Sequence, residues 1–420
     1  MPALEQFTAG AAADRILDSR GPEAARPSVA LLTGGLDRPY AFGLSSALAA
    51  KGVHLDVIGA EDLELLVDRA SLRVTFYNLY GDQRRKVARI ARLLRYLIAY
   101  AMLLRYAAQA TPRIFHILWN NRFQLFDRTL LMLYYRMLGK RIVLTAHNVN
   151  TAKRDGKDTA LNRLTLAAQY KLVDHIFVHT NAMRDALLRE YGVEERAVTV
   201  IPFGINNSVP NTLLSSSAAK QQLGIGAAEK VLLFFGGIRP YKGLEYLAEA
   251  FRVLACEDPR YKLIIAGEPK REAVQYWHDI EQTLARDQGC GRVMLNITYI
   301  DDADAEIYFK AADLAVLPYT QVYQSGVLFL SYSFGTPVVV TDVGALRDDV
   351  IPGETGYVCS PCDTTGLAQA IRNYFASDLY RNLEGRRTWI RTFAEQRNSW
   401  AVVSQKTVDV YRELLELRRA

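Results

Sequence analysis

Short apolar runs alternate with helical stretches along this sequence, and the alternation restricts the chain to α/β folds. Six runs lie in the first half and six in the second: SVALLTGG, VHLDVIG, IFHILWNN, RIVLTAHN, HIFVHTN and VTVIPFGI, then VLLFFGG, KLIIAGE, VMLNITYI, LAVLPY, TPVVVTD and TGYV. Such runs are typical of strands buried on both faces of a parallel sheet. Because parallel strands need crossover connections, we expect doubly wound sheets with helices on both faces.

The length of the chain predicts two domains. Its 420 residues exceed the limit of about 250 to 300 residues for a single hydrophobic core. The stretch 206–229 is rich in Asn, Ser, Pro and Ala and interrupts the alternation, which marks it as a linker. We therefore predict α/β domains at 28–205 and 230–392, followed by a helical segment at 393–420. Residues 1–27 lack the basic start and apolar centre of a signal peptide and are typical of a mobile tail.

Charge and cysteine content exclude several classes of protein. Lys and Arg number 51 against 45 Asp and Glu, a formal net charge of +6. This excess suits an acidic ligand or surface but is too mild to indicate a nucleic-acid partner. Of the four cysteines only Cys359 and Cys362 form a Cys-x-x-Cys pair, and no second Cys or His pair completes a zinc site. We expect free thiols, as in a reducing cytoplasm.

Residues 84–105, RRKVARIARLLRYLIAYAMLLR, form an amphipathic and basic helix in this prediction. No acidic residue occurs between Asp82 and Asp127, so nine Lys or Arg side chains are unopposed there. The longest uncharged run, Tyr96–Leu104, is too short for a bilayer span of about 20 residues. The predicted apolar side of the helix carries Val87, Ile90, Leu94, Leu97 and Ala101.

Two interpretations of this helix remain open. Its cationic side can dock on an anionic membrane, which would make the protein peripheral on the inner face of the membrane. Alternatively, the helix packs through its apolar side and leaves the cations in solvent. The membrane interpretation uses Arg84, Arg85, Lys86, Arg89, Arg92 and Arg95.

In the first half, a histidine and a glycine turn lie where open α/β sheets bind ligands. His147 follows the strand RIVLTA, at the carboxyl end of that strand. Gly34 and Gly35 follow the first strand without the G-x-G-x-x-G spacing of a dinucleotide site. They indicate either close approach of the backbone to a substrate or an ordinary tight turn. Trp119 ends the strand IFHIL and is a further acceptor-side candidate.

In the second half, two segments suit a polyphosphate. The stretch Val316–Val350 predicts a strand, a loop and a helix that opens at Ser325-Gly326-Val327. The first N–H groups of a helix lack intrahelical acceptors and its dipole is positive there, so a small-residue entry can bind phosphate. Upstream, the sequence FGGIRPYKG, residues 235–243, places glycines at a strand end, followed by Arg239 and Lys242. The planar guanidinium of Arg239 and the compact ammonium of Lys242 are both suited to binding phosphate oxygens.

Together these motifs resemble the retaining GT-B glycosyltransferases of the family 4 type. Gly236 and Lys242-Gly243 match part of the family's G-R-L-x-x-x-K-G motif, and Ala266-Gly267 matches its alanine-glycine loop. The sequence GTPVV at 335–339 matches the motif that follows the family's second glutamate. In the first half, Ala146-His147-Asn148 is similar to the family's active-site histidine segment. The resemblance extends from about Ser28 to the C-terminus.

The resemblance implies two Rossmann-like domains that face each other across a cleft, with the acceptor in the first and the nucleoside-diphosphate sugar in the second. The C-terminal helix is expected to return to the first domain. Catalytic roles fall on His147, which would position the sugar or acceptor, and on Lys242, which would stabilise the leaving group. The implied donor-binding residues are Gly236, Arg239, Lys242, Gly267, Tyr299, Ser325, Gly326 and Val327. The implied acceptor-side residues are Gly34, Gly35 and Trp119.

Three positions depart from the family pattern. Gly237 stands where the family has arginine, and Val322 and Leu330 stand where it has glutamates. Apolar side chains cannot hydrogen-bond a ribose or a sugar, so those contacts must come from elsewhere or be missing. A non-catalytic GT-B protein that binds a glycan or a partner enzyme is therefore the alternative to an enzyme.

The resemblance implies no metal and no cofactor besides the nucleotide sugar. Asp302-Ala303-Asp304 resembles the D-x-D of another glycosyltransferase fold, but it precedes a helix, where acids favour the positive dipole. The acceptor class stays open between a glycan, a lipid-linked sugar and a small molecule. A membrane-docked helix would favour a lipid-linked acceptor, as in exopolysaccharide or other surface polysaccharide assembly.

Overall fold

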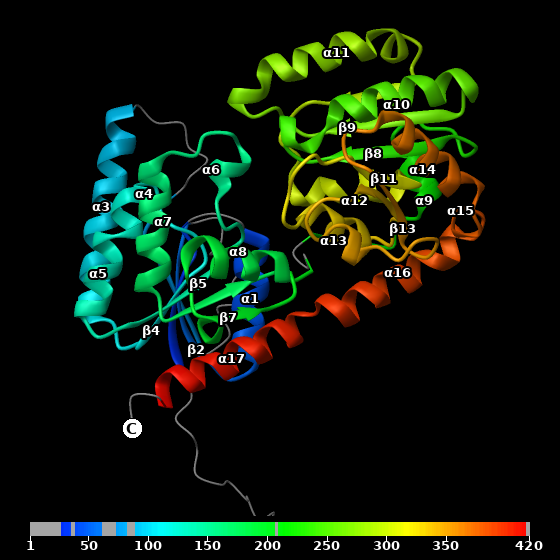
Figure 1. Cartoon of the computed structure of the whole chain (residues 1–420). Coiled ribbons are helices and arrows are strands. Elements are labelled where there is room, and N and C mark those ends of the chain that lie inside the picture. Colours follow the sequence, from blue (N-terminus) through cyan, green and yellow to red (C-terminus); the bar gives the residue numbers. More distant parts are fainter. Residues whose placement is uncertain (1–26, 35–37, 61–72, 82–88, 206–208, 417–420) are drawn as a thin grey trace, which may run out of the picture.

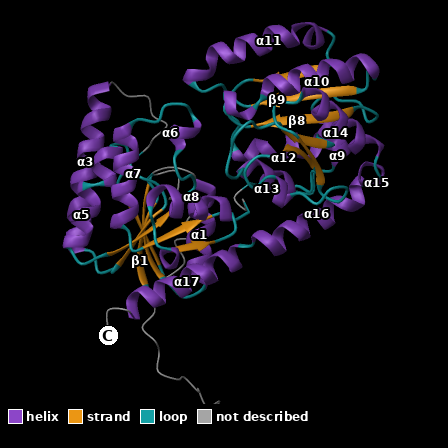
Figure 2. Cartoon of the chain, in the orientation of Figure 1, coloured by secondary structure: helices purple, strands orange, loops and turns teal. Residues whose placement is uncertain are grey.

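The computed structural model describes residues 27–34, 38–60, 73–81, 89–205 and 209–416. They form two α/β domains, each with one parallel sheet (Figure 1). Figure 2 shows each sheet at the centre of its domain with helices around it. The predicted fold class of two doubly wound domains is confirmed.

The N-terminal sheet has seven strands in the order β3-β2-β1-β4-β5-β6-β7. Because the chain runs outward to β3 and then returns to β4, the strand order reverses between β1 and β4. Ligands bind outside the carboxyl ends of parallel strands at such a reversal. The strands are β1 (Ser28–Leu32), β2 (His54–Gly59), β3 (Val74–Asn78), β4 (Ile114–Ile117), β5 (Arg141–Thr145), β6 (His175–Val178) and β7 (Val198–Val200).

The C-terminal sheet has six strands in the order β10-β9-β8-β11-β12-β13, so its reversal lies between β8 and β11. All registered pairs in this sheet are parallel. The strands are β8 (Lys230–Phe235), β9 (Tyr261–Ala266), β10 (Val293–Asn296), β11 (Leu314–Leu317), β12 (Val338–Thr341) and β13 (Gly356–Cys359).

Successive side chains of a strand point to opposite faces, so each sheet has two apolar layers. In the N-terminal domain Val29 and Leu31 pack with α1 and α17, whereas Ala30 and Leu32 pack with α3, α5, α7 and α8. The helices of this domain are α1 (Arg38–Ala50), α3 (Arg89–Gln109), α4 (Gln124–Arg128), α5 (Leu130–Met137), α6 (Thr151–Arg154), α7 (Ala160–Leu172) and α8 (Asn181–Tyr191).

The C-terminal domain repeats this arrangement. Leu232 and Phe234 of β8 pack with α10, α11 and α14, and Val231 and Leu233 pack with α12. The helices are α9 (Ser216–Gln222), α10 (Leu244–Glu257), α11 (Val274–Gly289), α12 (Asp302–Ala311), α13 (Gly326–Ser333), α14 (Thr364–Ala376), α15 (Asp378–Arg381), α16 (Leu383–Asn398) and α17 (Trp400–Glu416). None of the described helices combines the length and apolar character required to cross a bilayer.

The chain crosses between the domains twice, and the two crossings are hydrogen-bonded to each other. Helix α16 packs on α13 of the C-terminal domain, and α17 packs on α1 of the N-terminal domain (Figure 1). At the crossing the Asn398 amide donates to the Phe203 carbonyl at 2.9 Å, and the Trp400 indole donates to the Ile205 carbonyl at 2.7 Å. The helix that contains Phe393 begins earlier than predicted, at Leu383.

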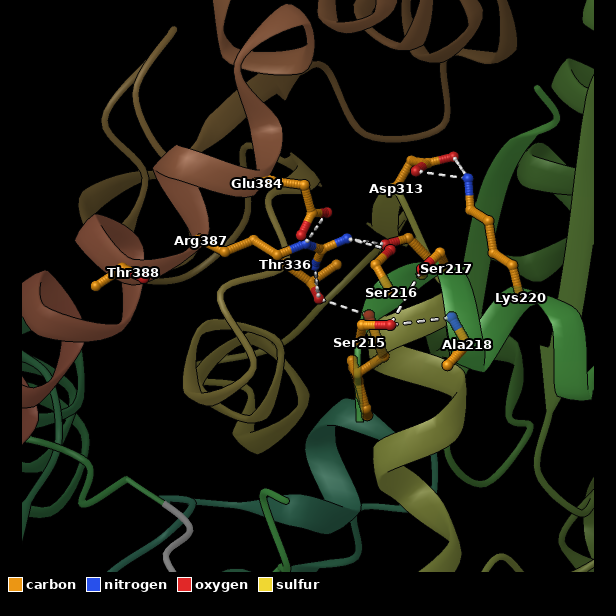
Figure 3. Close-up of polar contacts among 12 residues, drawn as sticks. Ser215, Ser216, Ser217, Ala218, Lys220, Asp313, Thr336, Glu384, Arg387 and Thr388 are labelled. Atoms are coloured by element: carbon orange, nitrogen blue, oxygen red, sulfur yellow. Dashed lines mark hydrogen bonds and ion pairs between the residues drawn. The ribbon is translucent and has the colours of Figure 1, made fainter. Parts of the chain in front are cut away.

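The glycine-threonine pair of the GTPVV motif holds α16 in place. A β-carbon at Gly335, whose φ is +70°, would lie 2.3 Å from the Arg387 carbonyl oxygen, so only glycine allows this approach. The buried Arg387 guanidinium donates to Thr336 at 3.1 Å (Figure 3). It also donates to the Ala312 carbonyl at 2.8 Å. The motif therefore fixes the position of the helix that leads back to the first domain.

Helix α3 packs with the opposite side from the one that its sequence pattern predicts. Ala99, Tyr100, Leu103 and Ala107 face the sheet. The predicted buried stripe is instead exposed, with 84% of Ile90, 56% of Leu94 and 52% of Leu97 accessible. The small residues allow close approach to the sheet, and Tyr100 donates a hydrogen bond to the buried Asp127 at 2.8 Å. Arg84, Arg85 and Lys86 lie outside the described residues.

Candidate active site

A cavity of about 390 Å³ lies between the domains, at the carboxyl ends of both sheets. Both strand-order reversals open onto it, because Trp119 follows β4 and Tyr319 follows β11. The N-terminal domain lines it with Pro39, Tyr40, Trp119, His147, Asn148 and Arg154, and the domain junction with Phe203, Gly204 and Trp400. The C-terminal domain contributes Tyr241, Lys242, Tyr319, Val322, Gln324, Ser325, Gly326, Val327 and Leu330.

His147 is held in an aromatic cage. The Trp119 indole stacks on it with ring centroids 4.2 Å apart and planes within 3° of parallel. Tyr40 meets the imidazole edge-on at 4.6 Å. The cage fixes the ring plane, so the histidine presents a defined edge to the cavity.

The hydrogen bonding of His147 determines what that edge offers. Its Nδ1 lies 3.1 Å from Nε2 of His179, whereas its buried Nε2 has no hydrogen-bond partner among the described residues. Burial, with a smaller effect from His179 and His116, lowers the pKa of His147 well below its usual range. The imidazole is therefore neutral at physiological pH.

The second histidine of this pair is also neutral. Burial lowers the pKa of His179 to about 4, although the backbone carbonyls of Ile201 and Pro202 favour its protonated form. One of the two facing nitrogens, Nδ1 of His147 or Nε2 of His179, carries the proton that joins the pair. Nε2 of His147 is therefore a hydrogen-bond acceptor in one tautomer and a donor in the other.

Gly34 supports Trp119 and does not line the cavity. Its φ is +60°, and a β-carbon there would lie 2.8 Å from the Trp119 carbonyl oxygen. Asn120 and Gln169 exchange two amide hydrogen bonds, at 3.2 and 3.0 Å, which hold the same loop. The glycine thus permits close contact with a neighbouring loop, and Gly35 lies outside the described residues.

Lys242 lies in the position that the glycine turn predicts. It ends a short 3-10 helix, Pro240–Lys242, after β8. A β-carbon at Gly236 would be 3.1 Å from the Lys242 ammonium nitrogen, and one at Gly267 would be 2.3 Å from the Gly236 carbonyl oxygen. Both glycines therefore form the floor beneath the lysine, and neither one lines the cavity directly.

Four cations gather at this end of the cavity. Burial, together with the positive charges of Arg239, Lys270 and Arg154 in that order, lowers the pKa of Lys242 to about 7. A β-carbon at Gly237 would lie 3.3 Å from Cε of Lys270, so this lysine fills the space beside the glycine that replaces the family's arginine. A cluster of like charges around a buried amine is typical of an anion site.

Helix α6 of the N-terminal domain reaches across to these cations. The Arg154 guanidinium lies over the Tyr241 ring, 4.2 Å from its centroid. Asp155 accepts from Arg154 at 2.7 Å and lies 3.9 Å from Arg239 of the other domain. Arg38 and Asp302 form a further ion pair between the domains at 3.8 Å.

The start of α13 faces the cavity as predicted from its small residues. Ser325 is the N-cap residue, is 5% exposed, and makes no side-chain capping bond to the helix. Its hydroxyl instead lies 3.4 Å from the Tyr319 hydroxyl. The N–H groups of Gly326 and Val327 belong to the first turn, where intrahelical acceptors are missing.

Val322 and Leu330 also line the cavity, and between them a glutamine supplies a polar group. The Gln324 amide donates to Asp349 at 3.0 Å, and its buried Oε1 has no hydrogen-bond partner among the described residues. Burial raises the pKa of Asp349 to about 6, against the opposing effects of Gln324 and Arg397. The carboxylate thus orients the amide so that its oxygen remains available.

Unmatched amide oxygens lie on the cavity wall. Oδ1 of Asn148 and Oε1 of Gln324 are hydrogen-bond acceptors without a partner among the described residues, and Nε2 of His147 accepts or donates according to its tautomer. Buried polar groups in folded proteins are nearly always paired, so a ligand with several donors fits this wall. The cavity therefore combines a cationic end with a wall of acceptors.

Besides Gly34, Gly236 and Gly267, the predicted site residues Tyr299 and Arg239 do not line this cavity. Tyr299 is 57% exposed, and Arg239 is turned toward Asp155. Tyr40, Arg154, Gln324 and Lys270 are further residues at the site, and no sequence motif marks them. Among the described residues no group of three or more His, Cys, Asp or Glu side chains is arranged to hold a metal ion.

Two family models match most of the chain. Residues 34–209 match the family described as Glycosyltransferase Family 4, and residues 229–377 match the family described as Glycosyl transferases group 1. A curated relative, D-inositol 3-phosphate glycosyltransferase of Corynebacterium diphtheriae, is 28% identical over 284 residues, 64% of this chain and 64% of that protein. The chain thus spans slightly less than two thirds of that relative's length.

Solved structures share the two-domain arrangement. Sucrose-phosphate synthase from Thermosynechococcus elongatus superposes with a TM-score of 0.72 at 22% identity and covers 93% of this chain and 100% of that chain. HepE from Anabaena in complex with UDP-glucose superposes with a TM-score of 0.69 at 17% identity, over 93% and 99% of the two chains. At these low sequence identities, the TM-scores show a common fold and nothing beyond it.

Proposed function

This chain belongs to the GT-B glycosyltransferases of the family 4 type, and we propose that it transfers a sugar from a nucleoside-diphosphate sugar to an acceptor bound by its N-terminal domain. The observation that carries the proposal is the division of the cavity into a cationic end and a wall of acceptors. A nucleotide sugar has the complementary parts, a dianionic diphosphate and a ring of donor hydroxyls. UDP-glucose is the first donor to test, because HepE was solved with it.

In this proposal the diphosphate binds at Lys242 and at the first turn of α13. Negative charge develops on the leaving diphosphate as the bond to the sugar breaks, and cations placed there beforehand stabilise that charge. Arg154 would join this group only when the domains are closed, because it comes from the other domain. No metal is needed in this scheme, and undiminished turnover in the presence of EDTA is the expected result.

His147 acts in the proposal as a hydrogen-bonding group and not as a general base. A neutral imidazole with an unmatched Nε2 can hydrogen-bond a sugar hydroxyl, which both donates and accepts, and so orient the donor or acceptor sugar. The acceptor is expected to attack on the face of the leaving group, so the configuration at the anomeric carbon is retained. An inverted product by NMR would contradict this stereochemistry.

Two groups take the place of the side chains that the family pattern loses. Lys270 fills the space beside Gly237 and replaces the charge of the missing arginine. Gln324 provides an oriented amide oxygen beside Val322 and Leu330, where the glutamates are missing. These replacements favour an enzyme over the non-catalytic alternative.

We propose a glycan or lipid-linked acceptor, in exopolysaccharide or other surface polysaccharide assembly. The C. diphtheriae relative is named for an inositol phosphate acceptor, so D-inositol 3-phosphate belongs in the same acceptor panel. Turnover with inositol phosphate alone would contradict the lipid-linked assignment while preserving the transferase assignment.

The proposal is tested by thermal-shift measurements of the full chain with UDP-, GDP-, ADP- and dTDP-sugars. A ligand at about 100 times its Kd stabilises the native state by about 2.7 kcal/mol, which raises the transition temperature by degrees. We expect one nucleotide class to shift the transition and Lys242→Ala to remove the shift. If no nucleotide sugar binds, with or without acceptor and membrane, the protein is a non-catalytic member of the family.

A further inference from the structure

Four neighbouring helices of the N-terminal domain expose an unusually apolar surface. Helices α3, α4, α5 and α7 lie together on one side of this domain (Figure 1). Tyr134 of α5 donates to the Leu104 carbonyl of α3 at 3.1 Å, and α7 contacts both α4 and α5. The inner sides of α3, α5 and α7 pack in the same core as the sheet. Because the four helices contact one another, their outer sides form one layer.

That outer layer carries twelve of the nineteen large apolar side chains that are exposed in the described part of the chain. They are between 44% and 84% accessible. Exposed apolar side chains in such number on adjoining elements mark an interaction surface, whereas isolated ones are ordinary. The residues are Ile90, Leu93, Leu94, Leu97, Ile98, Met102, Leu125, Leu130, Leu133, Met137, Leu161 and Leu164.

The charge of the same helices is almost entirely positive. The Lys and Arg side chains that the structure describes on them number six: Arg95, Arg105, Arg128, Arg136, Arg163 and Lys171. Their single acid, Asp127, is 1% exposed and accepts hydrogen bonds from Tyr100 and Asn121. The outer surface of the four helices therefore has no exposed carboxylate.

We propose that this surface is inserted into the headgroup region of an anionic membrane, with the apolar side chains among the lipid tails and the cations at the phosphates. A second copy of the chain is a poorer occupant, because the same positive charges would face each other across the interface. An apolar layer bordered by cations is instead complementary to anionic lipids. This inference does not depend on the proposed reaction.

Docking in this way would hold the cavity close to the bilayer. Trp119 lines the cavity, and Leu125 of the exposed layer follows it by six residues, at most about 20 Å of extended chain. The connection is rigid, since Phe123 between them stacks on Tyr100 of α3 at 5.3 Å. An acceptor anchored in the membrane could thus reach the N-terminal side of the cavity.

The test is co-sedimentation of the full chain with phosphatidylcholine vesicles that contain phosphatidylglycerol, at low and high salt. The variant combines Leu94→Gln, Leu97→Gln and Met137→Gln, which are exposed positions and good helix formers after substitution. The matched control combines Val253→Gln and Val274→Gln, which are 46% and 56% exposed on the other domain. We expect the vesicle partition coefficient of the variant to be at least tenfold lower than that of wild type. The control should have the same partition coefficient as wild type.

A second variant, Arg105→Gln with Lys171→Gln, tests the charge at two exposed residues of α3 and α7. We expect it to weaken binding to anionic vesicles at low salt and to leave residual binding to pure phosphatidylcholine unchanged. The proposal would be overturned if wild type did not sediment with anionic vesicles. It would also be overturned if the apolar variant and its control lost vesicle binding equally. A wild-type dimer in light scattering that the apolar variant converts to a monomer would also overturn it, in favour of a second copy. The nucleotide shift tests the transferase separately, so the two failures are distinguishable.

Discussion

The guanidinium carbon of Arg154 lies 4.2 Å from the centroid of the Tyr241 ring, and this contact joins the two domains at the cationic end of the cavity. Arg154 ends α6 of the N-terminal domain, and Tyr241 belongs to the turn that carries Lys242. The contact therefore couples domain closure to assembly of the proposed diphosphate site.

A double-mutant cycle measures that coupling. We expect Arg154→Met and Tyr241→Leu each to weaken donor binding, and the double variant to lose less than the sum of the two. The coupling free energy, which is the sum of the two single losses minus the loss in the double variant, should be about 0.5 to 2 kcal/mol, the range of a cation–π contact. Isothermal titration with UDP-glucose, or with the donor found in the screen, gives the four affinities. Strict additivity would show that the contact contributes nothing to closure.

Donor affinity should fall as the pH rises above about 7. Lys242 has a pKa of about 7 in the free protein, and a bound diphosphate raises this pKa because the ammonium gains an anionic partner. Below pH 7 the amine is charged with or without ligand, so affinity is constant. Above pH 7 binding must take up a proton, so affinity falls by up to about tenfold per pH unit.

The control for this pH dependence is Lys242→Met, which has no titrating amine. We expect weak donor binding with no slope between pH 7 and 8, and no buffer-dependent heat of proton uptake. A wild-type affinity that is constant over this range would show that the ammonium does not bind the diphosphate.

Replacement of His147 by phenylalanine separates stacking from hydrogen bonding. The ring remains against Trp119, but both nitrogens are lost. We expect kcat to fall by roughly 5- to 150-fold, because a buried hydroxyl of the substrate loses its hydrogen-bond partner at a cost of about 1 to 3 kcal/mol. The wild-type pH profile should show no inflection near pH 6.5 from this residue, since its pKa is far lower. An inflection there that the variant abolishes would instead indicate a general base.

Moving the positive charge from residue 270 to residue 237 tests the role of Lys270. We expect Lys270→Ala to weaken donor binding by roughly 10- to 150-fold, the loss of a hydrogen bond to a charged group. Addition of Gly237→Arg to that variant should restore most of the affinity, because the lysine side chain no longer fills the adjacent space. Lys262→Ala, on the same domain and paired with Glu229, is the control and should bind like wild type. Failure of the arginine to rescue binding would remove Lys270 from the diphosphate site.

Trp400 should be the most sensitive position for stability at the domain junction. Its indole covers Gly43 and Gly204, where an added β-carbon would lie 2.2 and 2.4 Å from the ring. We expect Trp400→Ala to reduce the free energy of unfolding by about 3 to 5 kcal/mol. Val402→Ala on the same helix, at a 38% exposed residue, should change it by less than about 0.5 kcal/mol. Equal urea midpoints for both variants would contradict the assigned packing.

Much of the fold and part of the site could be predicted from local patterns. Apolar runs identified twelve of the thirteen described strands, because strands buried on both faces are mostly apolar. They missed β3, an edge strand whose side chains are at least partly exposed. Glycines at strand ends marked Gly236 and Gly267, where the backbones approach too closely for a β-carbon. The cavity also contains His147, Lys242 and the Ser325-Gly326 helix start, since carboxyl ends of parallel strands meet at one edge.

The sequence by itself determined every described strand except β3 and the residues at the carboxyl ends of these strands, because these features depend on side chains close together in the chain. Only the tertiary structure decided which side of α3 packs, since both sides are apolar and the fit of Ala99 and Leu103 against the sheet made the choice. It also decided the contacts of Arg154 and Lys270. Such contacts join residues distant in the chain, and they exist only because the two domains are docked.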